Sequence, residues 1–202
     1  MKNIFLTFLI IILGYSPLKA QKLDFNIGFG SYRVPNQVKY ELPRAGFNMN
    51  FGLIYQINDK WEMGTAINHS VFNYDRQSLA GTPVSLGTFG TGGRVNSDHL
   101  YFILRRKISL PFNLEGSFGL GIGGYVENNE YLVAVAFDEE RNFYRGVSWN
   151  RDIEAGLHFP VSYTLKKIFS NKVYLGLEGG AFFDKNLNTR GIFIGPKAGI
   201  FL

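Results

Sequence analysis

The chain has 202 residues, enough for one substantial domain, with 24 glycines and 16% aromatic residues but only 18% charged residues. Ordinary proteins have about 7% glycine and about a quarter charged residues, so this composition favours many short strands over a helical domain. The absence of cysteine excludes disulfides, thiolate metal sites and thiol nucleophiles, and the net charge of +5 is too small and too scattered to indicate nucleic-acid binding.

The first element, residues 1–20, has the pattern of a cleaved secretory signal peptide. Lys2 supplies the positive start, residues 4–13 are apolar except for Thr7, and Pro17 and Ala20 precede a cleavage site before Gln21. The alternative is a membrane anchor, but the apolar run of roughly ten residues is well short of the ~20 that span a bilayer. Cleavage would reduce the net charge to +3 and leave residues 21–202 as one domain.

Eight segments of this domain alternate large apolar residues with small or polar ones, which is the period of a strand with two unlike faces. Their apolar positions run over Leu23–Phe29, Phe47–Tyr55, Trp61–Ile67, Leu100–Leu104, Leu114–Val126, Ile153–Val161, Val173–Leu177 and Ile192–Leu202. The predicted fold class is therefore all-β, with about eight strands.

The connections between these segments alternate in length. Long connections (32–45, 75–98 and 128–147) alternate with short ones (57–60 and 108–113), and the last two (164–172 and 184–190) are nearly equal. A transmembrane β-barrel has short periplasmic turns and longer outer loops, and this pattern predicts an antiparallel up-and-down barrel of that kind.

The third outer connection contains two further strand-like runs, Tyr131–Phe137 and Phe143–Trp149, on either side of a polar turn. We interpret them as a hairpin that extends the fifth and sixth strands beyond the membrane. A barrel of ten strands is the alternative.

The two faces of the predicted strands differ in size and charge. The bulky apolar face suits lipid, because the interior of an eight-stranded barrel is only wide enough for side chains to fill it. Six charged residues fall on the small-residue face, where a basic residue avoids the ~2–4 kcal/mol that exposure to mid-membrane lipid costs: Glu62, Arg105, Glu115, Glu154, Glu178 and Lys197. Arg106 has the opposite parity but lies near a strand end, where it can reach the interface.

Aromatic residues gather at the strand ends and are interpreted as two girdles at the membrane interfaces. One girdle comprises Tyr55, Trp61, Phe112, Tyr163 and Tyr174, and the other comprises Phe72, Tyr74, Tyr101, Tyr125 and Trp149. The alternative is a soluble barrel with its bulky face turned inward around a hydrophobic ligand.

With these features the segment 21–202 resembles the small outer-membrane barrels of the OmpA/OmpX-like superfamily, through its pattern rather than through a diagnostic motif. The resemblance implies location in the bacterial outer membrane, with short periplasmic turns and longer outer loops.

Motifs for catalysis or cofactor binding are discounted. Residues 119–124 match GxGxxG formally, but a dinucleotide site needs a helix after the motif and none is predicted. His69 and Ser70 are adjacent on a strand and so point to opposite faces. Glu154, His158 and Ser162 share a face, but steps of four residues separate them by about 13 Å each. We expect no enzyme activity, cofactor or metal.

Inside the barrel, Glu115 and Glu178 are expected to pair with Arg105 and Lys197 and plug the lumen, because buried charges need partners. The expected function is a structural or surface-interaction role, with outer-membrane lipid, lipopolysaccharide or a protein as partner and no nucleic acid. The candidate contact residues in the outer loops are Tyr40, Arg94, Tyr131 and Tyr144, accompanied by Tyr32, Arg33, Arg76 and Arg141. The alternatives are a narrow channel for ions or small solutes and a lipid A-modifying enzyme.

Overall fold

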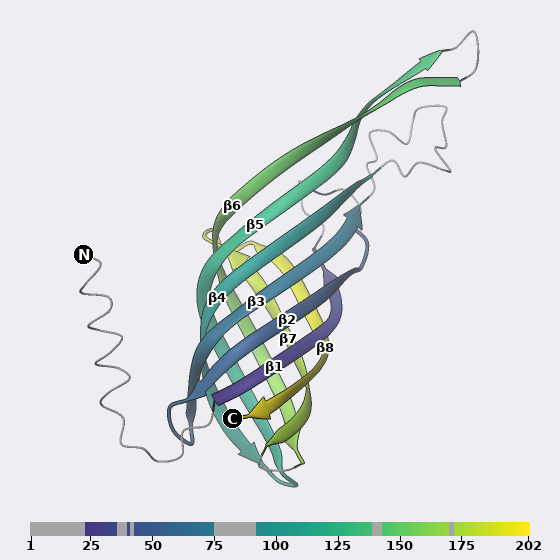
Figure 1. Cartoon of the computed structure of the whole chain (residues 1–202). Helices are drawn as coiled ribbons and strands as arrows, with labels where there is room; N and C mark the ends of the chain where they lie inside the picture. Colours follow the sequence, from purple (N-terminus) through teal and green to yellow (C-terminus); the bar gives the residue numbers. More distant parts are fainter. Residues whose placement is uncertain (1–22, 36–39, 41–42, 75–91, 139–142, 170–171) are drawn as a thin grey trace.

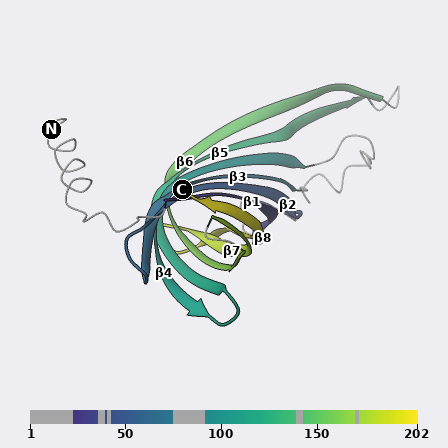
Figure 2. The ribbon, with the colours of Figure 1, turned by 60° about the horizontal axis from the view of Figure 1, so that its bottom comes forward.

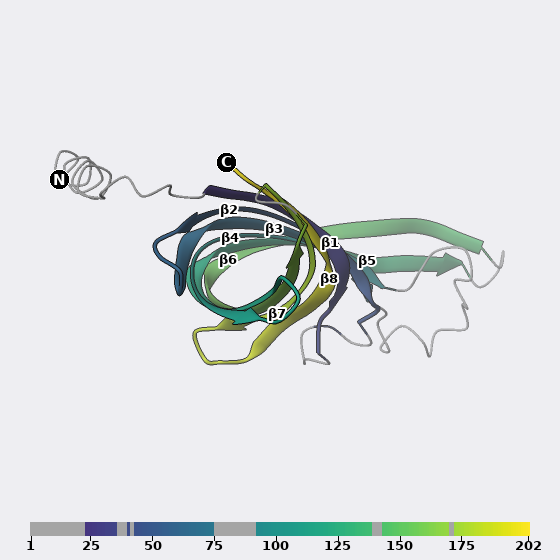
Figure 3. The same ribbon diagram turned by 90° about the horizontal axis from the view of Figure 1, so that it is seen from below.

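The computed structural model describes residues 23–35, 40, 43–74, 92–138, 143–169 and 172–202, and the predicted signal peptide lies outside them. Eight antiparallel strands form one closed ring in chain order, from β1 to β8 and back to β1 (Figures 1 and 3). Their bounds are β1 Leu23–Arg33, β2 Gly46–Gln56, β3 Trp61–Tyr74, β4 Gly93–Leu110, β5 Leu114–Asp138, β6 Phe143–Ile168, β7 Val173–Asp184 and β8 Thr189–Phe201. Within the described ranges, no helix has the length and hydropathy needed to cross a membrane.

The fold confirms the predicted up-and-down barrel of eight strands and excludes ten. The runs around residue 140 belong to β5 and β6, which pair with each other up to Asp138↔Phe143 (Figure 1). The short connections 57–60 and 111–113 lie at the end that holds the start of β1 and the end of β8, which we call the periplasmic end. The opposite end is called the outer end.

Several strands extend beyond the predicted segments. The fourth was expected to begin at Leu100, but β4 begins at Gly93 and pairs with β3 up to Gly93↔Tyr74. The reason is that backbone pairing continues above the level where apolar side chains are needed on the exterior, so the polar residues Arg94 and Asn96–His99 stay in the ladder. The predicted long connection 128–147 is accordingly reduced to residues 139–142.

The exterior is apolar, as the alternation predicted. Outward-facing side chains such as Leu100 and Ile194 are 60% and 63% exposed, and they belong to a band that surrounds the ring. Arg106 lies at the periplasmic end of this band with its guanidinium 6.0 Å from the ring of Trp61, which fits the predicted position at the interface.

The predicted aromatic girdles are wrong for half of their members. Trp61, Phe112, Tyr163 and Trp149 are exposed, whereas five others are buried inside the barrel: Phe72, Tyr74, Tyr101, Tyr125 and Tyr174. Each of these five residues occupies an inward-facing position in the alternation of its strand. The alternation therefore predicts their burial correctly, whereas their position near a strand end does not.

Inward-facing glycines make room for these rings. A Cβ added to Gly93 would lie 2.6 Å from the ring of Tyr74, and one added to Gly199 would lie 2.4 Å from the ring of Tyr174. In both cases the aromatic residue covers a glycine on the neighbouring strand, so large and small residues alternate around the inner wall.

The backbones of β1 and β8 approach each other closely at the seam that closes the ring. Gly30 and Gly195 both face inward across it, and a Cβ on Gly195 would lie 2.0 Å from the carbonyl oxygen of Phe29. Glycine is therefore required at these positions by close approach of the two chains.

The substitution Gly195→Ala is expected to impair closure of the barrel, because its methyl group would meet backbone atoms that cannot move aside. We expect the free energy of unfolding to fall by about 1–3 kcal/mol. The measurement is the fraction of unboiled protein that migrates as the folded band on a detergent gel. Gly28→Ala is the control, since its Cβ would lie 3.4 Å from the nearest atom, and equal behaviour of the two variants would contradict the argument.

Candidate functional site

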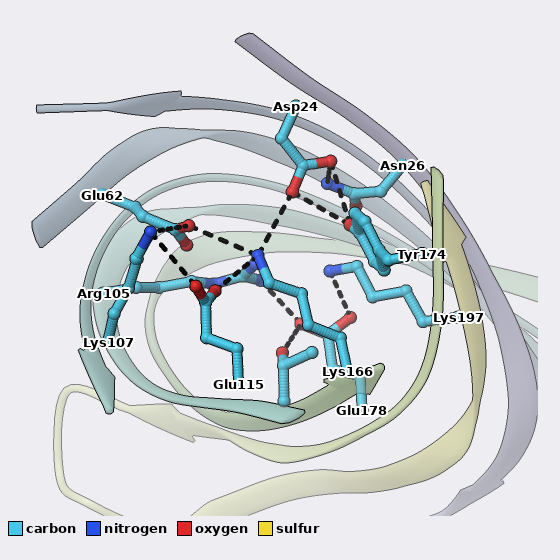
Figure 4. A network of polar contacts seen from close by, with 11 residues as sticks. Asp24, Asn26, Glu62, Arg105, Lys107, Glu115, Lys166, Tyr174, Glu178 and Lys197 are labelled. Carbon is cyan, nitrogen blue, oxygen red and sulfur yellow. Dashed lines mark hydrogen bonds and ion pairs between the residues drawn. The ribbon is translucent and has the colours of Figure 1, made fainter. Parts of the chain in front are cut away.

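A buried network of charges fills the periplasmic half of the lumen (Figure 4). The guanidinium of Arg105 on β4 lies 2.6 Å from the carboxylate of Glu178 on β7, and both side chains are less than 5% exposed. Lys197 on β8 contacts the other carboxylate oxygen of Glu178 at 3.0 Å. Because β4 and β7 stand three strands apart on the ring, the pair of Arg105 and Glu178 crosses the interior.

Lys166 on β6 is the centre of the second part of this network. Its ammonium group lies 2.9 Å from Glu115, 3.4 Å from Glu62 and 3.8 Å from Asp24. Lys107 adds contacts with Glu115 at 3.2 Å and with Glu62 at 3.8 Å. We call these eight residues the lumen charge network, with Asp24, Glu62, Glu115 and Glu178 as acids and Arg105, Lys107, Lys166 and Lys197 as bases.

The acids and bases of this network balance in number, so each buried charge has an opposite charge close by. The hydroxyl of Tyr174 adds hydrogen bonds to both carboxylate oxygens of Asp24, each at 2.9 Å. Burying a charge without such partners would cost free energy, and the balance of acids and bases compensates for the loss of hydration inside the barrel.

The network contains five of the six charged residues singled out from the sequence. The sixth, Glu154, lies elsewhere, near the outer end. Glu178 contacts both Arg105 and Lys197, whereas Glu115 contacts Lys107 and Lys166 instead of the two bases expected for it.

Sequence reasoning missed Asp24, Lys107 and Lys166. Lys166 had been assigned to a connection, although it continues the inward parity of Ser162 and Thr164 on β6. Extending the alternation past the last apolar residue would have found it.

An aromatic layer lies above the network, in the outer half of the lumen. The ring of His99 stacks on Phe182 with centroids 4.1 Å apart, and its Nδ1 lies 3.2 Å from Nδ1 of His158. At least one of these two nitrogens must be unprotonated, because a hydrogen bond between them needs an acceptor. Both histidines are buried, so the layer closes the interior with packed rings.

Charged and aromatic residues cap this layer at the outer end. Arg190 contacts Glu154 at 3.0 Å and Glu127 at 3.5 Å, and its guanidinium lies 4.0 Å from the centre of the Tyr125 ring. The hydroxyl of Tyr40, from the connection between β1 and β2, donates to Glu127. Burial and the Glu127 carboxylate raise the pKa of Tyr40 well above its usual value, so the phenol keeps its proton as a donor.

The predicted loop contacts therefore need correction. Tyr40 is only 3% exposed and packs against Phe72 and Tyr74, so it is part of the cap and not an exposed contact residue. Tyr32, also expected on the surface, is 2% exposed. Connections near the barrel mouth can fold inward, and their residue types do not reveal this.

The other candidates lie on strands at the outer end. Arg94 is exposed near the start of β4, and Tyr131 on β5 is partly buried and accepts a hydrogen bond from the amide of Asn150 at 3.0 Å. Tyr144 belongs to β6 in the part that pairs with the end of β5. Arg33 is exposed at the end of β1, whereas Arg76 and Arg141 lie outside the described residues.

The catalytic motifs considered in the sequence are placed as follows. Residues 119–124 lie within β5. Ser70 faces the lumen, whereas His69 faces outward with Nδ1 2.7 Å from Asp98. The carboxylate of Glu154 accepts a hydrogen bond from the hydroxyl of Tyr125 and forms an ion pair with Arg190. The imidazole of His158 contacts that of His99. Among the described residues no group of three or more histidine, aspartate or glutamate side chains is arranged to hold a metal ion.

Comparisons with known proteins agree with the fold. No family model matches the chain, and no curated protein matches its sequence. Solved structures that match nearly the whole barrel include the following two. A major outer membrane protein from Thermus thermophilus has a TM-score of 0.57 at 12% identity, over 91% of this chain and all of its own. Ail, the attachment invasion locus protein of Yersinia pestis, in complex with a heparin analogue, has a TM-score of 0.51 at 9% identity, over 90% of this chain and 99% of its own.

The closed ring, the apolar exterior band and these likenesses define the class of the protein. It has the fold of an eight-stranded transmembrane β-barrel, and it shares this fold with the two proteins just named.

Substitution of Glu178 tests how much the lumen charge network contributes to the stability of the barrel. Glu178→Gln would leave Arg105 and Lys197 without their common partner, and we expect the free energy of unfolding to fall by about 3–5 kcal/mol. Lys197→Met should cost much less, because the pair of Arg105 and Glu178 remains. The measurement is urea unfolding of the folded barrel in lipid vesicles, followed by tryptophan fluorescence. Equal losses for the two variants would contradict this account.

Proposed function

We propose that this protein is a non-enzymatic, non-conducting outer-membrane barrel that acts through contacts made above the membrane at its outer end. Two features support the proposal. The lumen is occupied by side chains that contact one another across it, and one hairpin extends far beyond the rest of the barrel.

The first support is the occupied lumen. Pairs from opposite walls meet at several levels: Arg105 with Glu178, Lys166 with Glu62, and Tyr40 with Glu127. Each pair joins strands or connections on different sides of the ring, so a solute crossing the barrel would have to break several buried ion pairs and hydrogen bonds. This arrangement favours a plug over the alternative of a narrow channel.

The single observation that carries the proposal is the β5–β6 hairpin. These strands cover Leu114–Asp138 and Phe143–Ile168, whereas β7 ends at Asp184 and is level with His158 (Figures 1 and 2). The hairpin projects past the rest of the ring, and its sequence between residues 131 and 137 is a continuous run of apolar residues. An apolar run in a segment that projects beyond the barrel supports a role in binding a partner.

The backbone of this hairpin also has unpaired edges. Within the described residues, β6 pairs with β7 only from His158 onward, and β5 pairs with β4 only up to Tyr131. Beyond these points, each strand has a described partner strand on one side alone. Such edges can accept an added strand from another chain, which makes a protein the favoured class of partner for the hairpin.

In planar lipid bilayers the purified barrel is expected to give no stepwise conductance, because the lumen charge network and the aromatic layer block its interior. Insertion is verified on the same preparation by the shift between boiled and unboiled protein on a detergent gel. Stepwise currents from the unaltered protein would overturn the non-conducting part of the proposal and restore the channel alternative.

The contact role of the hairpin can be tested by site-specific photocrosslinking in living cells. A photoreactive residue in place of Ser148, exposed on the hairpin, is expected to give a discrete adduct of protein size. The same residue in place of Leu187, which is 75% exposed in the turn between β7 and β8, is the control and should give none. Identical adducts at both positions, or none at Ser148, would contradict a partner site on the hairpin.

A further inference from the structure

The outer wall of β3, β4, β5 and β6 changes from apolar to charged in a regular series of rows. The strand register places outward-facing residues side by side: Ile67, Leu100, Gly124 and Leu157 form one row, and His69, Asp98, Val126 and Ala155 form the next. A third row holds Val71, Asn96, Asn128 and Ile153, and a fourth holds Asn73, Arg94, Glu130 and Arg151. The lipid boundary on this wall therefore lies near the second row.

The first two rows contain a groove. A hollow of about 510 Å³ is lined on the outer wall by Ile67, Asp98, Leu100, Gly124, Val126 and Ala155. It exists because Gly124 has no side chain between its bulky neighbours Leu100 and Leu157. A Cβ at Gly124 would meet only the carbonyl oxygen of Gly156, at 3.7 Å. Gly93 and Gly199 make room for neighbouring rings inside the barrel, whereas this glycine faces open space on the outside.

Polar groups stand at the upper edge of this groove, where Asp98 lines it, and in the row above. Nδ1 of His69 lies 2.7 Å from the carboxylate of Asp98, and their side chains are 40% and 64% exposed. Arg151 on β6 donates to the amide oxygen of Asn128 at 2.6 Å, lies 4.0 Å from the carboxylate of Glu130 and is 61% exposed. These exposed groups offer both hydrogen-bond donors and acceptors at the level of lipid headgroups.

Arg94 and Arg151 stand on either side of Glu130 in the fourth row, at the upper end of the same wall. Arg94 is exposed and makes no ion pair with another described residue, and it lines a second hollow of about 230 Å³ together with Arg44 and Trp149. Arg94 stands six residues above Leu100 on β4, or roughly 20 Å along the strand. A ligand that filled both hollows would need an apolar part below and an anionic, hydrogen-bonding part above.

We propose that this wall is a binding site for one phosphorylated glycolipid of the outer leaflet, with an acyl chain in the groove at Gly124 and a phosphate near Arg94 and Arg151. The sugar portion would lie against the amides of Asn96 and Asn128 and the pair of His69 and Asp98. The two hollows, the rows of side chains between them and the exposed guanidinium groups are the observations that carry the proposal. It is independent of the hairpin contact proposed above.

A glycolipid fits this wall better than a phospholipid because of the length of its polar part. The second and third rows, between Gly124 and Arg94, carry amide, imidazole and carboxylate groups, which hydrogen-bond to sugar hydroxyls. A single phosphate directly above an acyl chain would leave most of those groups unused.

The test uses the delipidated full barrel in detergent, mixed with diphosphoryl lipid A and examined by native mass spectrometry. We expect one bound lipid A and weaker binding of its dephosphorylated form and of phosphatidylglycerol. Gly124→Leu should weaken lipid A binding by about tenfold, because the new side chain displaces roughly two methylene groups of the acyl chain from the groove. Gly179→Leu is the matched control, since Gly179 faces lipid on β7 with ordinary contacts of 3.5 Å or more around its Cβ position.

A second pair of variants examines the headgroup end without altering the groove. Arg94→Gln should reduce the preference for phosphorylated over dephosphorylated lipid A, whereas Arg33→Gln, at an exposed arginine on β1, should not. Folding of every variant is verified by its gel shift, and if Gly124→Leu does not fold, the comparison of Arg94→Gln with Arg33→Gln decides. Equal binding by Gly124→Leu and Gly179→Leu, equal effects of the two arginine variants, or equal retention of phosphatidylglycerol and lipid A would overturn the proposal.

Discussion

The rest of the structure depends on closure of eight strands into a ring whose interior only side chains can fill. In lipid every backbone polar group must be satisfied internally, and a closed ring does this without leaving an edge within the membrane. Closure at this strand number fixes the interior width, so each inward position must match its neighbours in volume. The pairing of Tyr74 with Gly93 and of Tyr174 with Gly199 is a direct result, as is the contact of Gly30 with Gly195 at the seam.

The same constraint explains the chemistry of the lumen. A narrow interior lined from all sides brings charged side chains from distant parts of the chain within contact distance, and their mutual attraction compensates for the loss of hydration. Lys166 meets three carboxylates from three other strands. The core of a soluble protein is filled with apolar side chains and would exclude such residues. In this barrel the apolar side chains are needed on the exterior, where they face lipid.

The alternation of residues was enough to predict the fold, the number of strands and the face on which the lumen charges lie. It could not predict which charges meet, because partners such as Arg105 and Glu178 depend on the register of strands far apart in the sequence. The strand ends were misplaced for a different reason: polar residues such as Asn96 continue the ladder where solvent or headgroups replace lipid. Tyr40 was placed on the surface because no local pattern shows that a connection folds back over the mouth of the barrel.

The unequal strand lengths have a mechanical consequence. The β5–β6 hairpin is continuous with the barrel wall, and its two strands remain hydrogen-bonded from Leu114↔Lys167 to Asp138↔Phe143 with only two irregularities. A force applied to one of these strands along its axis loads this ladder in shear, so many bonds share the tension at once instead of opening one after another. Tension on one strand of the hairpin is therefore shared with the other strand along the whole ladder, including the part that lies within the ring.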